Sequence, residues 1–387
     1  MMFQIDEFFQ NDKIKSDGFE SVGLSFGKTG VPVFFCATKQ KIERGPFELK
    51  NESELTEILG SDIINGALLD RMTHTAVRAF FESGGERLIL VLLSLEGKAP
   101  IETEYFDGLI CQQQDFVNRG GLHLVKDYDA LGDVMLFPQA ALILKPDALK
   151  DFYFKVQATL EQMAPYFLVV DPPYLKSMDA LAQWLKGFDS RWSAVYFPWV
   201  SMEAVGFLPP SSIVASQWQL WDGSYGCAEA PSNRPLLKKL TPLVEIGSAE
   251  LAAVKVDRRF NVIRYLPSGD QAFWGCSTLS HSTDAYRFIH IARTVRSLED
   301  AILRLCEPYV FEPRTEAVAE KLQGQIESFL SGLEEKGILV AQVSDHRAFE
   351  VKAEIPKEQN PHDNEILLNL WVSFERYQDR LGLHYTV

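Results

Sequence analysis

Asp171 is the residue of this chain best placed to do chemistry. It follows an apolar strand pattern and precedes two prolines, and active sites of α/β proteins gather at the carboxyl ends of strands. A carboxylate there can act as a general acid or base if a second acid, base or lysine lies beside it. The surrounding sequence indicates no such partner. An α/β enzyme with its site near Asp171 is therefore an alternative and not the main hypothesis.

Histidines and cysteines offer no better candidates. The seven histidines lie far apart without the spacing of metal ligands, and the five cysteines form no Cys-x-x-Cys pair. Scattered thiols are typical of a reduced, cytosolic protein. Ser83-Gly84-Gly85 resembles a phosphate loop, but it follows a helix pattern and precedes a strand pattern, which reverses the order in phosphate loops. We expect no catalytic residue, no metal and no cofactor.

Charge and hydropathy argue against two further classes of protein. The 387 residues carry a formal net charge of −15, whereas a nucleic-acid binder ordinarily has a basic face. No stretch approaches about 18 consecutive apolar residues, the length expected of a membrane span. The start of the chain lacks the basic and apolar regions of a signal peptide. We expect a protein that is made in the cytoplasm, binds no nucleic acid and does not insert into a membrane.

Residues 28–205 predict one α/β domain, in which helix patterns alternate with apolar strand patterns. The helix patterns cover 52–59, 73–83, 147–163 and 177–185, and the strand patterns cover 31–37, 87–93, 140–144, 166–170 and 194–197. Near-continuous aliphatic strands indicate a sheet that is covered on both faces.

Residues 206–352 predict a second domain. Its first part, 206–250, is rich in Pro, Ser, Gly and Trp and predicts long loops around short strands. A strand–turn–strand pattern follows over 260–280. A short helix from Ser297 and a long amphipathic helix over 314–336 complete this domain.

Alternating apolar residues mark both ends of the chain. In the N-terminal segment, 1–27, they are Val22, Leu24 and Phe26. In the C-terminal segment, 353–387, a polar linker precedes Leu368, Leu370, Val372 and Phe374. Each pattern predicts a strand with one apolar face. The first could begin the main domain or form a donated arm, and the second must find a sheet with which to pair.

One segment is basic although the chain as a whole is acidic. Between Lys255 and Arg304, eight basic residues oppose five acidic ones. Such a segment suits an acidic surface on a partner. Alternatively, its arginines pair with carboxylates of the same chain, and the sequence leaves both interpretations open.

Several short motifs follow one another in the order of a known family. They are Ala76-Val77-Arg78, Gly84-Gly85, Val170-Asp171-Pro172-Pro173, Pro209-Pro210-Ser211, Asn261-Val262-Ile263-Arg264, Trp274-Gly275, Thr278-Leu279-Ser280 and Phe311-Glu312-Pro313. In order and spacing they resemble contractile tail sheath proteins, which occur in contractile phage tails and phage-tail-like injection particles. The likeness extends from about Val31 to about Val343. Ser212-Ile213 replaces the Gly-His that phage sheaths usually carry, which favours an injection system.

The resemblance implies a structural subunit and not an enzyme. It implies an outer α/β domain at the sheath surface and an inner sheath-core domain that faces the tail tube. Extended N- and C-terminal β-arms would complete sheets in neighbouring subunits. The subunits would form a helical homo-oligomer, with stacked hexameric rings, around an inner tube protein between baseplate and terminal cap proteins. In this family the sheath contracts without nucleotide hydrolysis and drives the tube through a target envelope.

The same resemblance implies that a helix of the inner domain touches the tube. We expect this helix at 297–306, with Arg293, Arg296 and Arg304 as candidate contacts to acidic tube residues. The protein would assemble in the bacterial cytoplasm and then belong to a released or membrane-docked particle or to a phage virion. A non-contracting paralogue that serves as a cap or baseplate adaptor is a further alternative.

Overall fold

The described residues belong to two compact units. The computed structural model describes residues 29–42, 46–61, 63, 66–94, 132–161, 166–203, 205–247, 259–282, 285–341, 347–355 and 366–374. The larger unit is Lys28–Ser297, and the smaller unit comprises Leu298–Val387 together with Met1–Gly27. The strand expected at Val22, Leu24 and Phe26 lies outside the described residues.

A sheet of eight strands forms the centre of the larger unit. In spatial order the strands are β11 (Gln271–Trp274), β10 (Asn261–Tyr265), β6 (Ser193–Phe197), β5 (Phe167–Val170), β4 (Val134–Leu136), β1 (Pro32–Thr38), β3 (Leu88–Ser94) and β2 (Phe47–Leu49). The six inner strands run parallel, and the two edge strands run antiparallel to their neighbours. The inner strands are apolar over most of their length because helices cover both faces of the sheet.

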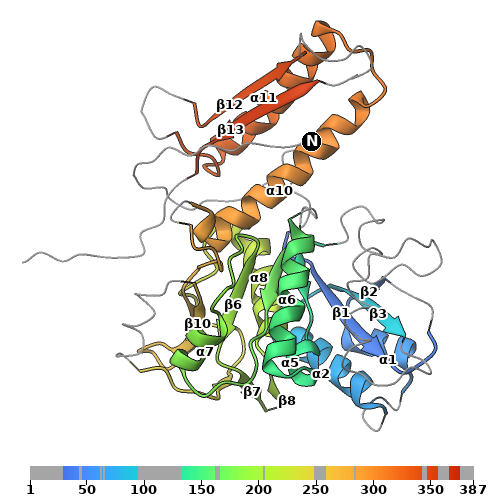
Figure 1. Ribbon diagram of the computed structural model, residues 1–387, viewed down its shortest axis with the longest axis vertical. Helices are drawn as coiled ribbons and strands as arrows, with labels where there is room; N and C mark the ends of the chain where they lie inside the picture. Colours follow the sequence, from blue (N-terminus) through green and yellow to red (C-terminus); the bar gives the residue numbers. More distant parts are fainter. Residues whose placement is uncertain are drawn as a thin grey trace, which may run out of the picture. The chain divides into compact units, whose positions relative to one another are not determined.

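Helices pack on the sheet from two sides. α8 (Ser211–Tyr225) contacts β1, β4 and β5, and it packs against α2 (Leu68–Glu82). α6 (Pro146–Leu160) contacts β5 and lies in front of the sheet in Figure 1, whereas α8 lies behind it. The shorter helices are α1 (Glu52–Leu59), α5 (Ala140–Ile143) and α7 (Met178–Trp184). The α/β fold class expected from the sequence is thereby confirmed.

A small sheet and one short helix complete the larger unit. Three strands, β8 (Gly206–Leu208), β7 (Val200–Met202) and β9 (Thr241–Pro242), pair antiparallel in that order. A 3₁₀ helix, η2 (Ala285–Arg287), precedes α10 (Ile289–Cys306). Because β10 pairs with β6, the hairpin of β10 and β11 belongs to the larger unit. The two units divide after Ser297, whereas the sequence predicts a domain boundary at 205.

Two sequence predictions within the larger unit are wrong. Residues 140–144 contain the short helix α5, and the strand lies earlier, at β4. Residues 211–225, expected as loop, form α8. Every residue from Ser211 to Trp218 is buried, including serines and a glutamine, so α8 shows no polar face by which its sequence could be recognised as helical.

α10 begins earlier than the sequence suggests and runs across the division between the units. It starts at Ile289 and not at Ser297. Residues up to Ser297 belong to the larger unit, and those from Leu298 to the smaller. Arg293, Thr294 and Arg296 are buried in the first half. These polar residues interrupt the apolar stripe from which a helix is ordinarily recognised.

The smaller unit packs a two-stranded sheet against helices. After α10 come η3 (Glu307–Tyr309), α11 (Glu316–Glu335), β12 (Phe349–Glu354) and β13 (Leu367–Val372). The Thr315 side chain accepts from the Val318 N–H and caps α11. Leu298, Ile302 and Leu305 of α10 join the core that α11 and both strands form. Within the described part of the chain, every helix is too short or too polar to span a membrane.

Asp171 has a structural position at the start of α8. Its carboxylate accepts from the Ser211 backbone N–H at 3.0 Å and from the Ser211 hydroxyl at 2.5 Å. Its own N–H donates to the Tyr153 hydroxyl. The first N–H groups of a helix lack partners within the helix, and Asp171 supplies one. Complete burial raises the pKa of Asp171 to about 7, although both bonds from Ser211 oppose the rise.

The raised pKa makes stability depend on pH through Asp171. Between about pH 4 and about pH 7 the folded state holds a proton that the unfolded state has lost. The free energy of unfolding therefore falls as pH rises through this window, by up to about 1.4 kcal/mol per pH unit. We expect Asp171→Asn to lack this part of the pH dependence when urea unfolding of both proteins is compared. Parallel pH curves for wild type and variant would contradict the assignment.

Candidate functional site

Polar side chains bond within the protein at the place where a doubly wound sheet ordinarily binds a ligand. β1 pairs with β3 on one side and with β4 on the other, and such folds form a ligand crevice where the strand order reverses. The buried Gln139 side chain accepts there from the Ala37 N–H and donates to the Ala37 and Leu69 carbonyls. The Thr38 hydroxyl donates to Asp70 at 2.6 Å. These bonds give the polar groups of the crevice a structural role.

Asp171 also lies at the carboxyl end of a strand, as the sequence suggests. Both of its oxygens bond to Ser211, and the residue has no exposed surface. A substrate would have to displace these bonds to reach the carboxyl group. Among the described residues, no three His, Cys, Asp or Glu side chains lie close enough together to hold a metal ion.

Arg293, the first candidate tube contact, is buried in a cluster of charges. Its side chain is 2% exposed. The guanidinium donates to both carboxylate oxygens of Asp222, at 3.1 and 2.5 Å, and to Asp133 at 3.0 Å. It also lies over the Trp218 ring, 4.6 Å from the centroid. Burial alone would lower the pKa of Arg293, but the two carboxylates raise it well above its ordinary value.

The other two candidates differ from each other in exposure. Arg296 is 4% exposed, donates to the Leu160 carbonyl at 2.7 Å and lies 3.8 Å from the Trp192 ring centroid. The Arg304 side chain is 51% exposed and forms an ion pair with Asp300 at 3.0 Å. Arg293 and Arg296 thus bind groups of their own unit, which departs from the surface contacts expected of them. Arg304 remains available at the surface.

The C-terminal residues expected in a donated strand do form a strand. β13 pairs antiparallel with β12 of the same chain, and Val351 lies opposite Leu370. The apolar side chains that face the core of the smaller unit are Leu368, Leu370 and Val372, and the partly buried Phe374 packs against the same core. The strand prediction is confirmed. Its partner is a strand of its own chain, whereas a neighbouring subunit was expected.

The sheet of β12 and β13 contains two strands, and neither edge pairs with a third strand within the described residues. Hydrogen-bonded pairs alternate along an antiparallel ladder, and the Ser373 N–H donates to the Ala348 carbonyl. By this alternation Val351 and Ala353 turn their N–H groups away from β13, and the Ala353 N–H donates to the Gln323 side chain. The sheet gains stability from the core that it shares with α10 and α11. A strand edge without a partner strand can act as a template for a further strand.

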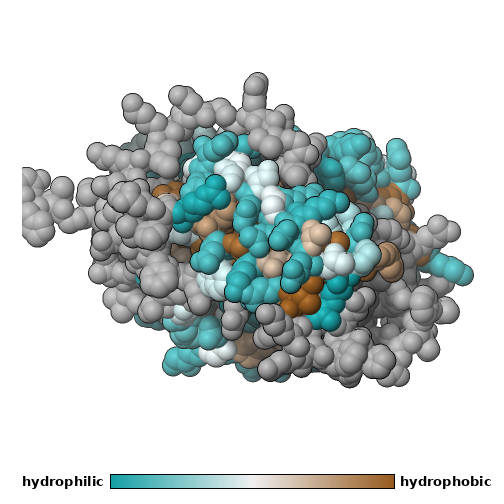
Figure 2. Space-filling model, turned by 90° about the horizontal axis from the view of Figure 1, so that it is seen from above, coloured by the Kyte–Doolittle hydropathy of each residue, from teal (hydrophilic) through white to brown (hydrophobic). Residues whose placement is uncertain are grey.

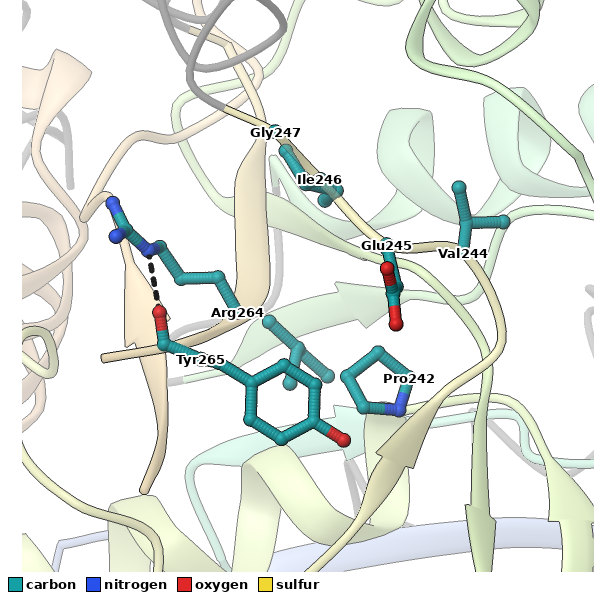
Figure 3. A pocket seen from close by; sticks show the side chains of 8 residues that line it. Pro242, Val244, Glu245, Ile246, Gly247, Arg264 and Tyr265 are labelled. Carbon is teal, nitrogen blue, oxygen red and sulfur yellow. Dashed lines mark hydrogen bonds between the residues drawn. The ribbon is translucent and has the colours of Figure 1, made fainter. Parts of the chain in front are cut away.

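Several large apolar side chains are exposed. Among the coloured residues in Figure 2, hydrophilic ones prevail and apolar ones form small separate patches. Exposed large apolar residues include Leu303, Val310 and Phe311 in the smaller unit and Phe207, Leu237 and Tyr265 in the larger. A pocket of about 450 Å³ lies beside β10 (Figure 3).

Removing Arg293 should destabilise the larger unit, because two buried carboxylates would lose their counter-charge. We expect Arg293→Met to lower the free energy of unfolding by about 3–5 kcal/mol. Arg304→Met is the matched control on the same helix, and removal of its exposed ion pair should cost under about 1 kcal/mol. Urea unfolding measures both. A similar loss in the two variants would contradict the structural role of Arg293.

Comparison with known proteins identifies the fold. No family model and no curated relative matches the chain. The contracted sheath complex of an extracellular contractile injection system, PVC, is 19% identical with a TM-score of 0.73 and covers 98% of each chain. The contracted helical sheath of the anti-feeding prophage is 22% identical with a TM-score of 0.71, over 97% of this chain and 98% of that one.

A more distant likeness extends to a Listeria innocua sheath tail protein. It is 10% identical with a TM-score of 0.55, over 89% of this chain and 96% of that one. Identities this low speak to the fold, and the expectation drawn from the motifs is confirmed at that level. The chain therefore has the α/β fold of contractile sheath proteins.

Proposed function

We propose that this protein is the structural subunit of a contractile sheath, which polymerises as a helix around an inner tube and contracts without nucleotide hydrolysis. The observation that carries the proposal is the match of nearly the whole chain to sheath structures in the contracted state. TM-scores above 0.7 to injection-system sheaths, against 0.55 for the Listeria protein, favour an injection particle over a phage tail. The same matches to sheath structures support a structural, non-enzymatic role.

Assembly would use the open edges of the β12–β13 sheet. A strand from another copy can add there through main-chain hydrogen bonds, and alternate side chains would fix its register. The segments before Thr29 and after Phe374 are the arms that would supply such strands. Contacts of this kind keep subunits connected while each one rotates as a rigid body.

The partners of the sheath follow from the same proposal. An inner tube protein, a baseplate and a terminal cap would bind the sheath, and Arg304 on α10 is the remaining candidate for a tube contact. The particle would assemble in the bacterial cytoplasm and then be released or docked at a membrane. A non-contracting sheath paralogue at the cap or baseplate is the second candidate, since one similar structure is the anti-feeding prophage baseplate, 22% identical with a TM-score of 0.72 over 97% of this chain and 98% of that one.

Negative-stain electron microscopy of the purified full chain tests the proposal. A sheath subunit should form tubes of constant diameter, because each copy offers the same edges to the next. A chain that ends at Phe374 keeps β13 and its pairing with β12, and we expect it to remain folded without forming tubes. A protein that stays monomeric at all concentrations would contradict the sheath assignment. Tubes formed equally well by the shortened chain would contradict the C-terminal arm.

Charge reversal at Arg304 tests the tube contact. Arg304→Glu should reduce several-fold the yield of extended particles when sheath and tube proteins are co-expressed, whereas tubes of sheath protein alone should form as before. Lys336→Glu, at the end of α11, is the matched control and should leave both yields unchanged. Particle counts by electron microscopy give the comparison. Normal yields from Arg304→Glu would remove Arg304 from the tube contact.

A further inference from the structure

One cluster of charges bonds to both ends of the larger unit, which begins at Lys28 and ends at Ser297. Arg293 lies about one helical turn before the second end. Its guanidinium donates to Asp133 and to Asp222, and these three residues are named the ion cluster. Each of the two carboxylates bonds in addition to the first residues of the unit.

Both aspartates hold the chain where it enters the unit. Asp133 receives Arg293 on one carboxylate oxygen, and its other oxygen accepts from the Val31 N–H at 2.8 Å. The Asp133 N–H donates to the Val31 carbonyl at 3.0 Å, so both backbone groups of Val31 are bonded. The Thr29 side chain bonds to the Asp222 carboxylate. Bonds to charged carboxylates are roughly twice as strong as bonds between neutral groups.

Gly30 brings the chain against α8 between these bonds. Its φ is +77°, and an added Cβ atom would lie 2.9 Å from the Asp222 carboxylate and 2.9 Å from the Gln219 Cα. The Gly30 carbonyl accepts from the Gln219 side chain at 3.3 Å. A larger residue here would push the chain away from Asp222. β1 then starts with Pro32, which has no N–H to donate, so side chains supply the bonds just before the strand.

The ion cluster is buried, and its bonds are therefore costly to break. The exposed fraction of the side chain is 2% for Arg293, 5% for Asp222 and 11% for Asp133. If one of these residues moved away, the others would remain as buried charges without their partner, which is strongly unfavourable. The two ends of the unit are thus joined by bonds that resist separation.

The sheet offers a second, longer path between the same two ends. The chain enters the sheet at β1, and the last strands before α10 are β10 and β11. In the sheet, β4, β5 and β6 lie between β1 and β10. A pull on both ends that passed along this path would load the hydrogen bonds between all of these strands. The ion cluster bypasses them.

We propose that the ion cluster is a tension link, through which a pull on the segment before Thr29 reaches α10 while the eight-stranded sheet carries little of the load. The link rests on the proposed function, because a contracting sheath pulls on the segments that connect its subunits. The larger unit can then rotate as a rigid body with its sheet intact.

Optical tweezers on single molecules of the full chain test the link. Handles at the two termini pull on both ends of the larger unit, whose unfolding is recognised by the greater gain in length. Arg293→Met should raise the rate of this step at constant force about 100-fold, because two buried carboxylates lose their counter-charge. An unchanged rate would overturn the proposal.

A second pulling direction separates a tension link from a general contribution to stability. Handles at Lys50 and Glu203, two exposed positions of the larger unit, load the sheet and not the two ends. In this direction Arg293→Met should raise the unfolding rate by less than about tenfold, since the strands separate before the ion cluster is loaded. A rise as large as with handles at the termini would overturn the proposal.

Thr29→Val gives a milder test that leaves Arg293 and both aspartates in place. It removes one bond of the link, so pulling at the termini should unfold the larger unit about fivefold faster. Thr159→Val is the matched control, because its hydroxyl donates to the Lys155 carbonyl within α6, and it should leave the rate unchanged. Equal rates for the two variants would overturn the link.

These experiments separate the link from the sheath assignment, because single molecules are pulled without assembly. The expected rates in a protein that never forms tubes would keep the link and overturn the sheath function. Tubes formed by a protein whose Arg293→Met variant shows equal rises in both pulling directions would keep the sheath function and overturn the link.

Discussion

The organisation of this protein depends on how the backbone groups at sheet edges find partners. In the larger unit the edges are closed or short: β2 has three residues, and the Asn233 and Leu236 N–H groups donate to carbonyls of β11. In the smaller unit the described sheet has two strands, and neither edge pairs with a third described strand. The Ala353 N–H on one edge donates to Gln323, and helices of the same unit pack against the sheet. Its edges are places where a further strand could pair.

The buried polar groups of the larger unit stabilise the fold. In the larger unit, places where an α/β enzyme would act are occupied by bonds within the chain: Gln139 at the reversal of strand order, Asp171 at the start of α8, and Arg293 between two aspartates. Removing any one partner would leave another buried group unsatisfied, so these clusters fix the positions of helices on the sheet. Arg304, the residue proposed above as a tube contact, is instead exposed.

Much of the fold could be predicted from the sequence, and the failures have physical reasons. The aliphatic strands β1, β3, β5 and β6 and the amphipathic α11 follow simple periodicities. α8 could not be recognised, because it is buried on nearly all sides and carries serine and glutamine inside. The buried arginines of α10 looked like surface charges, since nothing local in the sequence shows that Asp133 and Asp222 come to meet Arg293. The strand of Leu368, Leu370 and Val372 was found, but its pairing with β12 depends on tertiary structure.

The alternating C-terminal strand had a sequence signal in Leu368, Leu370 and Val372. We propose that strands of other copies complete the β12–β13 sheet, and a helical cryo-electron microscopy reconstruction of the assembled protein tests this. We expect density for a strand of another copy along an edge of the β12–β13 sheet. An assembly in which that sheet keeps two strands, with both edges facing solvent, would contradict it.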